Sequence, residues 1–361
     1  DRGNGGGLLC GIVMSNGSLK NILKAYRYIV PSSLIATHPA KPRDSARLLV
    51  WNKKQGSVSV DTFRNLPNYL PPHAVLVFNN TKVLPARLTL KKESGGLVRI
   101  LYLSHDAKEI RCLADRPLAI GSTVRVPEES ASFKVNKKDG AVYYLVPSFP
   151  MARMRSWLYK KGRAPIPPYI KNTPLSEAQL KQEYQTIFAR IEGSVAAPTA
   201  SLHFTARLMR RLSCEGIAQK YITLHVGLGT FAPLTHKELA AGALHEERFS
   251  LSKSAVRFLN RAKKQGRPII AVGTTAVRAL ESAINEKGML VAGENTTRLF
   301  IREGYKWKFI DGMITNFHVP ASSLMMLVAA FIGRKKLLSL YRFAIKKKFR
   351  LFSFGDGMVL Y

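Results

Sequence analysis

Five short segments, rich in valine, isoleucine, leucine and tyrosine, decide the fold: LVRILYL (97–103), IRCL (110–113), STVRV (122–126), SFKV (132–135) and VYYLV (142–146). Turn-forming residues separate them, as at Ser94–Gly96 and Lys138–Gly140. Short runs of branched and aromatic residues at this spacing are typical of small all-β barrels. We therefore expect a β-barrel between about residues 89 and 150.

The sequence on either side of the barrel has a different pattern. The run AVLVF (Ala74–Phe78) predicts a buried strand that ends at the turn-forming Asn79–Asn80. Beyond residue 150, strand patterns alternate with helix patterns, which predicts an α/β domain. The expected strands are Tyr221–Val226, Pro268–Val272, Leu299–Ile301, Trp307–Ile310 and Leu351–Phe354. The expected helices are Ala152–Lys160, Glu177–Ala189, Ser201–Cys214, His236–Leu244, Ser252–Gln265, Thr275–Asn285, Ser322–Ile332 and Arg334–Lys347.

The predicted architecture is an α/β (mixed α+β) main domain with an inserted small all-β barrel. The main domain is discontinuous, with residues 18–88 and 151–361, and the barrel takes residues 89–150. The chain starts at Asp1 with a glycine-rich stretch. We expect residues 1–17 to be a tag or a disordered start.

The net charge is the first indication of a partner. The 361 residues include 56 Lys and Arg against 23 Asp and Glu, which gives a formal charge of +33. A chain this basic attracts polyanions, of which nucleic acid is the leading one and an anionic membrane surface the second. A lysine-rich background without any binding role gives the same number, so charge alone does not choose between these readings.

Cysteines and apolar runs narrow the class of protein. Cys10, Cys112 and Cys214 are scattered, which predicts no disulfide framework and favours a reducing compartment. The longest apolar runs, residues 322–333 and 8–14, are shorter than the ~20 residues that a membrane helix needs. We expect a cytoplasmic protein without a membrane partner.

A glycine-rich loop follows the strand expected at Tyr221–Val226. Residues 227–232 fit the pattern G-x-G-x-x-A, with Gly227, Gly229 and Thr230 placed to approach a phosphate or an adenosine. The acidic pair Glu246–Glu247 lies downstream at about the distance that suits a ribose hydroxyl. Pro233 delays the next helix, so a plain strand-to-helix turn is an equal reading.

The sequence lacks the common motifs for metal binding, for serine hydrolases and for phosphate-binding loops. The stretch HEER (245–248) lacks the second histidine of H-E-x-x-H, and His225, His236 and His245 have no helical ligand spacing, so no metal site is predicted. Neither a G-x-S-x-G elbow nor a G-x-x-x-x-G-K-[ST] loop occurs.

Polar clusters instead follow the expected strands. Ligands of open α/β sheets bind at the carboxyl ends of the strands, where such loops gather. The clusters are residues 79–82, residues 193–199 with His203, His225, residues 273–275 with Arg278 and Glu281, Asp311, residues 316–318, and residues 355–357.

Taken together, these clusters resemble the S-adenosylmethionine:tRNA ribosyltransferase-isomerases of queuosine biosynthesis. The resemblance covers all but about the first 24 residues. Its motifs are RDSARLL (43–49), VFNNTKVLPARL (77–88), GRAPIPPYI (162–170), YQTIFA (184–189), GSVAAPTASLHFT (193–205), ITLHVGLGTF (222–231), VGTTAVRALE (272–281), ITNFHVPASSLMMLV (314–328) and FSFGDGM (352–358).

The resemblance implies a cytoplasmic, usually monomeric enzyme with an inserted β-barrel. Such enzymes use S-adenosylmethionine as a ribosyl donor and need no metal. The acceptor is 7-aminomethyl-7-deazaguanine at the wobble position of a tRNA. The ribosyl unit is transferred and isomerised, which gives epoxyqueuosine and releases adenine and methionine.

Four positions depart from the family pattern. Asn80 stands where aspartate is expected, Ser201 replaces glycine, Ala321 replaces lysine, and Gly357 replaces alanine. The first removes a carboxylate, and the third weakens an anion contact near His318.

Residue types suggest roles at the matched positions. The candidate acids and bases are His203, His225, His318 and Glu246. Asp311 is a further candidate, which is expected to hold a ribose hydroxyl or the acceptor base. Candidate donor-binding residues are Gly227, Gly229, Thr230, Thr274, Thr275 and Arg278. Arg278 is expected to bind the methionine carboxylate, with an ion pair to Glu281 as the alternative. Candidate acceptor-binding residues are Asn79, Thr81, Lys82, Arg87, Ser194, Thr199, Asn316 and Asp356.

Binding of tRNA is expected to use spread lysines and arginines for phosphates and an aromatic ring for the extruded base. The basic clusters are Lys91–Lys92, Arg153 with Arg155, Lys160–Lys161 with Arg163, Lys335–Lys336, and Lys346–Lys348 with Arg350; the rings are Phe204, Phe231 and Phe317. Two other classes stay open: a non-catalytic RNA-binding module and an S-adenosylmethionine-dependent methyltransferase.

Overall fold

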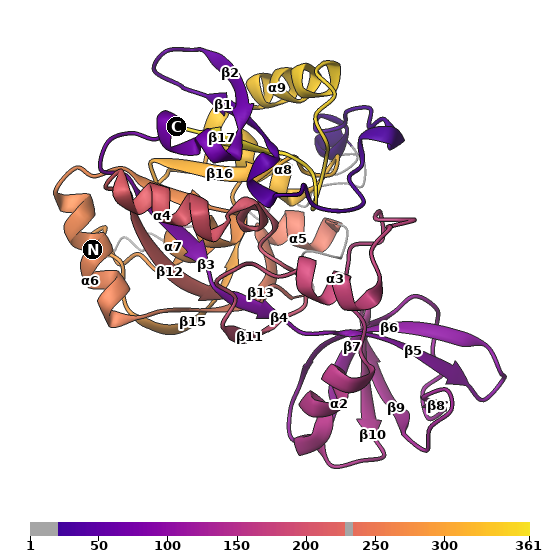
Figure 1. The fold of residues 1–361 in the computed structure, drawn as a ribbon. Coiled ribbons are helices and arrows are strands. Elements are labelled where there is room, and N and C mark those ends of the chain that lie inside the picture. Colours follow the sequence, from indigo (N-terminus) through magenta and orange to yellow (C-terminus); the bar gives the residue numbers. More distant parts are fainter. Residues whose placement is uncertain (1–20, 228–233) are drawn as a thin grey trace, which may run out of the picture.

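A computed structural model describes residues 21–227 and 234–361. These residues form a body built on one large sheet and a barrel that projects from it (Figure 1). The expected mixed α/β fold with a small β-barrel is confirmed. The expectation for residues 1–17 lies outside the described residues.

The described residues place nine strands in the large sheet. In spatial order they are β15 (Gly293–Leu299), β13 (Ala243–Leu251), β12 (Ala218–Leu224), β3 (Val75–Asn79), β14 (Ile269–Val272), β16 (Gly312–Asn316), β17 (Gly357–Leu360), β1 (Arg47–Trp51) and β2 (Val58–Thr62). The centre, from β12 to β16, is parallel. Antiparallel strands flank it on both sides.

The central strand β3 shows why the centre is uniformly apolar. Val75 and Val77 pack with helices α6 (Lys253–Lys264), α7 (Thr274–Ser282), α8 (Ser323–Ile332) and α9 (Arg334–Lys346). Leu76 and Phe78 point to the other face, against α4 (Ala206–Cys214). Because successive side chains alternate between faces, a strand covered on both sides is apolar throughout.

The remaining helices are short. They are α2 (Met154–Lys161), α3 (Glu177–Glu183) and α5 (His236–Ala241). Single 3-10 segments lie at Ser32–Leu34, Arg43–Ser45, Phe63–Tyr69, Met151–Arg153 and Thr199–His203. No helix in the described ranges is both long and apolar enough to cross a membrane.

The barrel closes with six strands rather than the five expected. Around the barrel they are β10 (Val142–Pro147), β7 (Ile110–Ala114), β6 (Leu97–His105), β5 (Arg87–Lys92), β8 (Thr123–Arg125) and β9 (Ser132–Asp139). The additional strand is β5, in which Leu88 and Leu90 point inward. Met154 and Leu158 of α2 pack into the same apolar cluster.

The two chain segments that connect barrel and body are joined to each other. The backbone N–H of Arg87 donates to Arg163 at 3.1 Å, and that of Arg163 donates to Arg87 at 2.8 Å. Beside them, β4 (Thr81–Val83) pairs in parallel with β11 (Ile191–Ser194). The barrel strands end close to the expected boundaries at residues 89 and 150, and the division into separate domains stays a prediction.

Candidate active site

A cavity of about 520 Å³ lies at the carboxyl edge of the parallel strands. Its walls include residues that directly follow β12, β14 and β16: Val226, Gly273–Thr275 and Phe317–His318. This is the edge at which open α/β sheets bind ligands. Six of the predicted site residues lie on the wall of this one cavity: Thr199, Thr274, Thr275, Arg278, Asn316 and His318.

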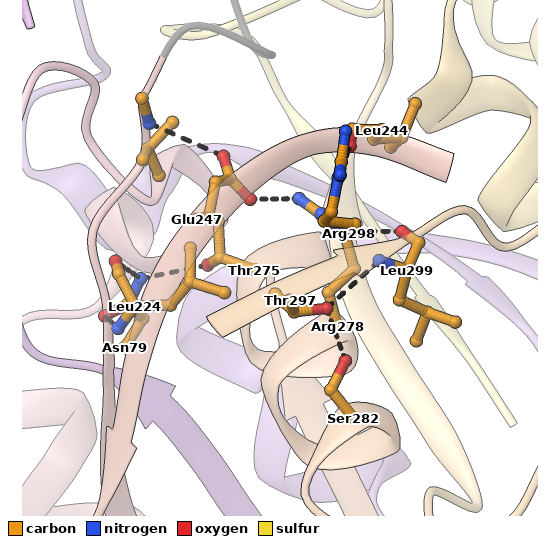
Figure 2. Close-up of polar contacts among 12 residues, drawn as sticks. Asn79, Leu224, Leu244, Glu247, Thr275, Arg278, Ser282, Thr297, Arg298 and Leu299 are labelled. Carbon is orange, nitrogen blue, oxygen red and sulfur yellow. Dashed lines mark hydrogen bonds and ion pairs between the residues drawn. The ribbon is translucent and has the colours of Figure 1, made fainter. Parts of the chain in front are cut away.

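The most buried charges on the cavity wall are Arg278 of α7 and Glu247 of β13. Nη1 of Arg278 donates to Oε2 of Glu247, and Nε donates to the carbonyl oxygen of Leu299 at 3.1 Å (Figure 2). The two residues are only 7% and 4% exposed. Arg278 therefore pairs with Glu247 and not with Glu281, the alternative that the sequence left open.

Glu281 has a different task. Its Oε1 accepts the backbone N–H groups of Phe309 and Ile310 at 3.0 and 3.1 Å, and its Oε2 accepts from Tyr305 at 3.0 Å. It thus anchors the segment before β16.

Strand parity separates the two neighbouring glutamates. Glu247 is buried in the cavity wall, while Glu246 is exposed. Since successive side chains of a strand point to opposite faces, only one of the pair reaches the cavity. The structure therefore places Glu247, and not the predicted Glu246, on the cavity wall, a distinction that the sequence analysis could not make because it did not recognise β13.

Asn79 joins three elements beneath the cavity. Its Nδ2 donates to the carbonyl oxygen of Leu224 at 2.9 Å and to Oγ1 of Thr275 at 3.2 Å, and its Oδ1 accepts from the backbone of Thr81 and Leu224 (Figure 2). Asn79 is fully buried. It positions Thr275, on the first turn of α7, rather than lining the cavity itself.

The three predicted histidines have different surroundings. His318 lines the cavity, and its Nε2 lies 2.8 Å from Oγ1 of Thr315. His203 is buried under Asn316, with Nε2 2.9 Å from Oδ1, and it stacks on Phe63. His225 contacts Thr81 through Nδ1 at 2.8 Å, with its ring against Gly193.

Burial makes all three imidazoles weak bases. It lowers the pKa of His203 and of His318 to about 4, and it lowers the pKa of His225, to which Arg248 also contributes. All three rings are therefore neutral at pH 7. Of the three, His318 carries its neutral ring in the cavity wall.

Part of the cavity lining is apolar and aromatic. It is formed by Pro167, Pro168, Tyr169, Phe317 and Phe352. The hydroxyl of Tyr169 lies 2.6 Å from Oγ of Ser353, and burial raises the pKa of this phenol. Flat apolar surfaces with a few placed polar atoms suit a heterocyclic base.

Several predicted residues lie away from the cavity and hold the fold together. Asp311 precedes β16 at the amino edge of the sheet, where it accepts from the backbone of Ile269 and pairs with Lys263. Asp356 accepts from the backbone of Arg47 and Arg350 at 3.0 and 2.8 Å. Their polar contacts account for both carboxylates without a ligand.

Four other predicted residues make contacts around the barrel connection and β11. Lys82 pairs with Glu192 at 3.2 Å, and Arg87 donates to the carbonyl oxygen of Ile166 at 2.8 Å. Ser194 accepts from the backbone of Val226 at 2.9 Å, and Thr81 holds His225. None of the four is on the wall of the 520 Å³ cavity as the described residues define it.

Parts of the predicted glycine loop are not described. Gly227 is described and lies beside Glu247, with its N–H 3.5 Å from Oε1. Gly229, Thr230 and Phe231 lie outside the described residues. Of the two described candidate rings for base stacking, Phe204 is in the core and Phe317 lines the cavity.

Sequence reasoning chose Glu246 of the acidic pair as an acid or base, and it did not select Tyr169, Thr315 or Ser353, which lie on the cavity wall together with Glu247. The charged run HEER hides the strand pattern of residues 243–251. The other three carried no local pattern, because only the fold brings Tyr169 of one loop against Ser353 of another. No group of three or more His, Cys, Asp or Glu side chains suited to a metal ion occurs among residues 21–227 and 234–361.

Comparison with known proteins gives a consistent family. Residues 23–360 match the family model described as queuosine biosynthesis protein. The chain is 41% identical over 352 residues to a Fusobacterium nucleatum protein named S-adenosylmethionine:tRNA ribosyltransferase-isomerase, covering 95% of this chain and 98% of the relative. It is 43% identical over 346 residues to a protein of the same name from Magnetococcus marinus, covering 94% of each.

A solved structure agrees with these relatives. The S-adenosylmethionine tRNA ribosyltransferase from Thermotoga maritima is similar in fold, with a TM-score of 0.52 and 29% identity. The alignment covers 93% of this chain and 99% of that one.

Proposed function

Since the chain belongs to the queuosine biosynthesis family and is a ribosyltransferase-isomerase that acts on tRNA with S-adenosylmethionine, we propose the following reaction. The ribosyl unit of S-adenosylmethionine is transferred to the aminomethyl nitrogen of 7-aminomethyl-7-deazaguanine at the wobble position. It is isomerised to an epoxycyclopentanediol, which gives epoxyqueuosine-tRNA, and adenine and methionine leave. The enzyme works as a monomer in the cytoplasm, where its tRNA is found.

The observation that carries this proposal is the make-up of the single cavity at the strand ends. Its lining includes the buried pair Arg278–Glu247 as well as apolar and aromatic residues such as Tyr169 and Phe317. S-adenosylmethionine has matching parts, with a charged amino-acid end and a flat adenine. Thr274, Thr275 and Asn316 are polar residues of the same lining and suit ribose hydroxyls.

His318 is the residue that we assign to proton transfer. The reaction needs a base for the acidic proton on the carbon beside the sulfonium and an acid for the departing adenine. A neutral imidazole has a lone pair that accepts a proton at pH 7. His203 and His225 act as positioning residues, because they hold Asn316 and Thr81 respectively.

Recognition of the tRNA backbone is assigned to the surface of α9 and the residues after it. Residues 312–355 contain eight Lys and Arg and no Asp or Glu. Five of these cations are exposed, and no carboxylate pairs with them in the part of the chain that the structure describes. They are Lys335, Arg342, Lys346, Lys347 and Lys348, referred to below as the α9 basic surface.

Product analysis tests the reaction. The enzyme is incubated with S-adenosylmethionine and tRNA that carries the 7-aminomethyl-7-deazaguanine base. We expect adenine and methionine in equal amounts. Release of S-adenosylhomocysteine would instead identify a methyltransferase, and tight tRNA binding without either product would identify a binding module.

A further inference from the structure

The pair Arg278–Glu247 leaves one atom of each charge available for a ligand. Arg278 uses Nη1 and Nε within the protein, while Nη2 is buried without a hydrogen-bond partner among residues 21–227 and 234–361. Glu247 uses Oε2 for the pair, and its Oε1 accepts a long bond of 3.5 Å from Gly227. Buried polar atoms normally have partners, so an unpartnered guanidinium nitrogen on a residue of the cavity lining is where we expect a ligand atom to bind.

The net charge of this pair selects the kind of ligand. Arg278 and Glu247 compensate each other, so a phosphate or a lone carboxylate gains the guanidinium but is repelled by Glu247. A lone amine is attracted by Glu247 but repelled by the guanidinium group of Arg278. A ligand that carries both charges on neighbouring atoms satisfies both free positions without leaving a buried charge unpaired.

We propose that Arg278 and Glu247 together bind the α-amino-acid group of the donor's methionine part. Nη2 of Arg278 donates to the α-carboxylate, and Oε1 of Glu247 accepts from the α-ammonium group. This inference rests on the proposed function for the identity of the donor, and it gives Glu247, which the sequence analysis considered only for a ribose hydroxyl, a contact with the α-ammonium group.

The neighbourhood supports a preformed site rather than an adaptable one. Nε of Arg278 is held by Leu299 O at 3.1 Å, and the adjacent Thr297 bonds Ser282 of α7 at 2.6 Å (Figure 2). Glu247 lies on β13, where it is paired in register with Thr297 of β15. Rigid placement of both partners reduces the entropy lost on binding.

The test is a thermodynamic cycle on donor binding to the enzyme alone, without tRNA. Binding of S-adenosylmethionine is compared with that of its decarboxylated analogue and of the analogue without the α-amino group, for the wild type and for Glu247→Gln. We expect each analogue to bind the wild type at least about 10-fold more weakly. Glu247→Gln is expected to weaken S-adenosylmethionine binding by a similar factor but to change binding of the amino-free analogue by less than about 3-fold.

That non-additivity separates direct contact from a structural role. If Glu247 only holds Arg278 in place, the substitution weakens S-adenosylmethionine and the amino-free analogue by the same factor, because both keep the carboxylate that Arg278 binds; this result overturns the proposal. If Glu247 faces the acceptor amine instead, donor binding is unchanged and only the KM for tRNA rises, which also overturns it. Glu246→Gln, one residue away and exposed, is the matched control and leaves all three affinities unchanged.

The two proposals fail in different ways. The thermodynamic cycle can give the expected result while no adenine is released in the presence of tRNA. This outcome would contradict the proposed reaction but would still support the amino-acid site. Adenine release with an additive cycle would contradict the amino-acid site alone. Thermal unfolding of Glu247→Gln checks that the fold is kept, and the cycle can be repeated with Glu247→Asp, which retains the charge and is expected to restore part of the discrimination.

Discussion

At the scale of single residues, chemistry in this protein depends on which face of an element a side chain occupies. Glu246 and Glu247 are neighbours of identical chemistry, yet only Glu247 reaches the cavity. The same holds for the histidines, since His318 is in the wall while His203 is stacked beneath it on Phe63. A motif brings the right residues near a site, and the backbone decides which of them touch the ligand.

The assignment of proton transfer to His318 predicts unequal effects of substitution. His318→Gln removes the imidazole from the cavity and is expected to lower single-turnover adenine release by about 100-fold or more. His225→Gln leaves the cavity wall intact and should lower it by less than about 10-fold. Equal rates for wild type and His318→Gln would contradict the assignment.

The buried His203 predicts a pH-dependent stability. Its pKa is about 4 in the folded protein against 6.5 for the free side chain. Between these values the unfolded chain binds more protons, so stability is complete above about pH 6.5 and is lost as the pH falls toward 4. From pH 7.5 to 5 this group alone costs about 2 kcal/mol of unfolding free energy.

Denaturant unfolding at the two pH values measures this effect. His203→Gln keeps an N–H donor for Asn316 but does not titrate. We expect the variant to lose about 2 kcal/mol less than the wild type over the same pH range. Parallel losses in both proteins would show that His203 is not the responsible group.

At the scale of elements, the barrel depends on a tight crossing of the two segments that connect it to the body. A Cβ atom on Gly162 would lie 1.7 Å from the carbonyl oxygen of Pro85 and 2.6 Å from that of Leu158. Backbone atoms on both sides cannot move away cheaply. The glycine is needed here for space, since its φ of −72° is open to any residue.

The crossing predicts a strong effect of one methyl group. Gly162→Ala is expected to lower the unfolding free energy by about 2 kcal/mol or more through overpacking. Gly96→Ala, in a barrel turn with open space around its Cβ position, is the control and should stay within about 0.5 kcal/mol. Equal thermal midpoints of the two variants would contradict the close crossing.

The elements also show what sequence reasoning reaches. The run AVLVF was enough to predict a central strand, because a strand that is buried on both faces is apolar throughout. The short β segments were enough to predict a barrel, because burial on one face leaves an alternating pattern. The strands β1, β2, β4, β5, β11, β13, β16 and β17 were missed, and the strands expected at Trp307–Ile310 and Leu351–Phe354 do not form. In β13 the charged run HEER (245–248) interrupts the apolar pattern. Glu246 and Arg248 of this run are exposed, and Glu247 lines the cavity, so none of the three packs in an apolar core.

The cavity itself was predictable only in part. Thr274, Thr275, Arg278, Asn316 and His318 follow strands that end at one edge, which the sequence indicates. The partner of Arg278 was not predictable, because β13 and α7 meet through the order of strands in the sheet. Asp311 and Asp356 lie in similar polar motifs but anchor backbone N–H groups, and nothing in their spacing distinguishes that task from binding.

At the scale of the whole molecule, the positive charge is unevenly divided. The barrel, residues 89–150, has ten Lys and Arg against seven Asp and Glu, so almost all of the +33 belongs to the α/β part. Three of the ten barrel cations pair with carboxylates: Arg99 with Asp115, Arg111 with Asp106 and Lys137 with Glu109. The α9 basic surface is therefore the better candidate for phosphate contacts.

Substitution of this surface predicts a change in salt dependence. In K335Q/R342Q/K346Q the slope of log K for tRNA against log salt should fall by roughly one unit per lost phosphate contact. The control R99Q/K137Q/R211Q removes the same charge from cations that are paired with carboxylates. Equal slopes for the two triple variants would move the tRNA surface elsewhere.

The most direct measurement follows the ribose itself. S-adenosylmethionine with a uniformly carbon-13-labelled ribose is incubated with the enzyme and with tRNA that carries the 7-aminomethyl-7-deazaguanine base. The mass of the modified nucleoside is then measured by mass spectrometry. The account predicts that the wobble nucleoside gains every labelled ribose carbon while unlabelled adenine and methionine leave. A wobble nucleoside that gains only an unlabelled methyl group, or nothing, would contradict it.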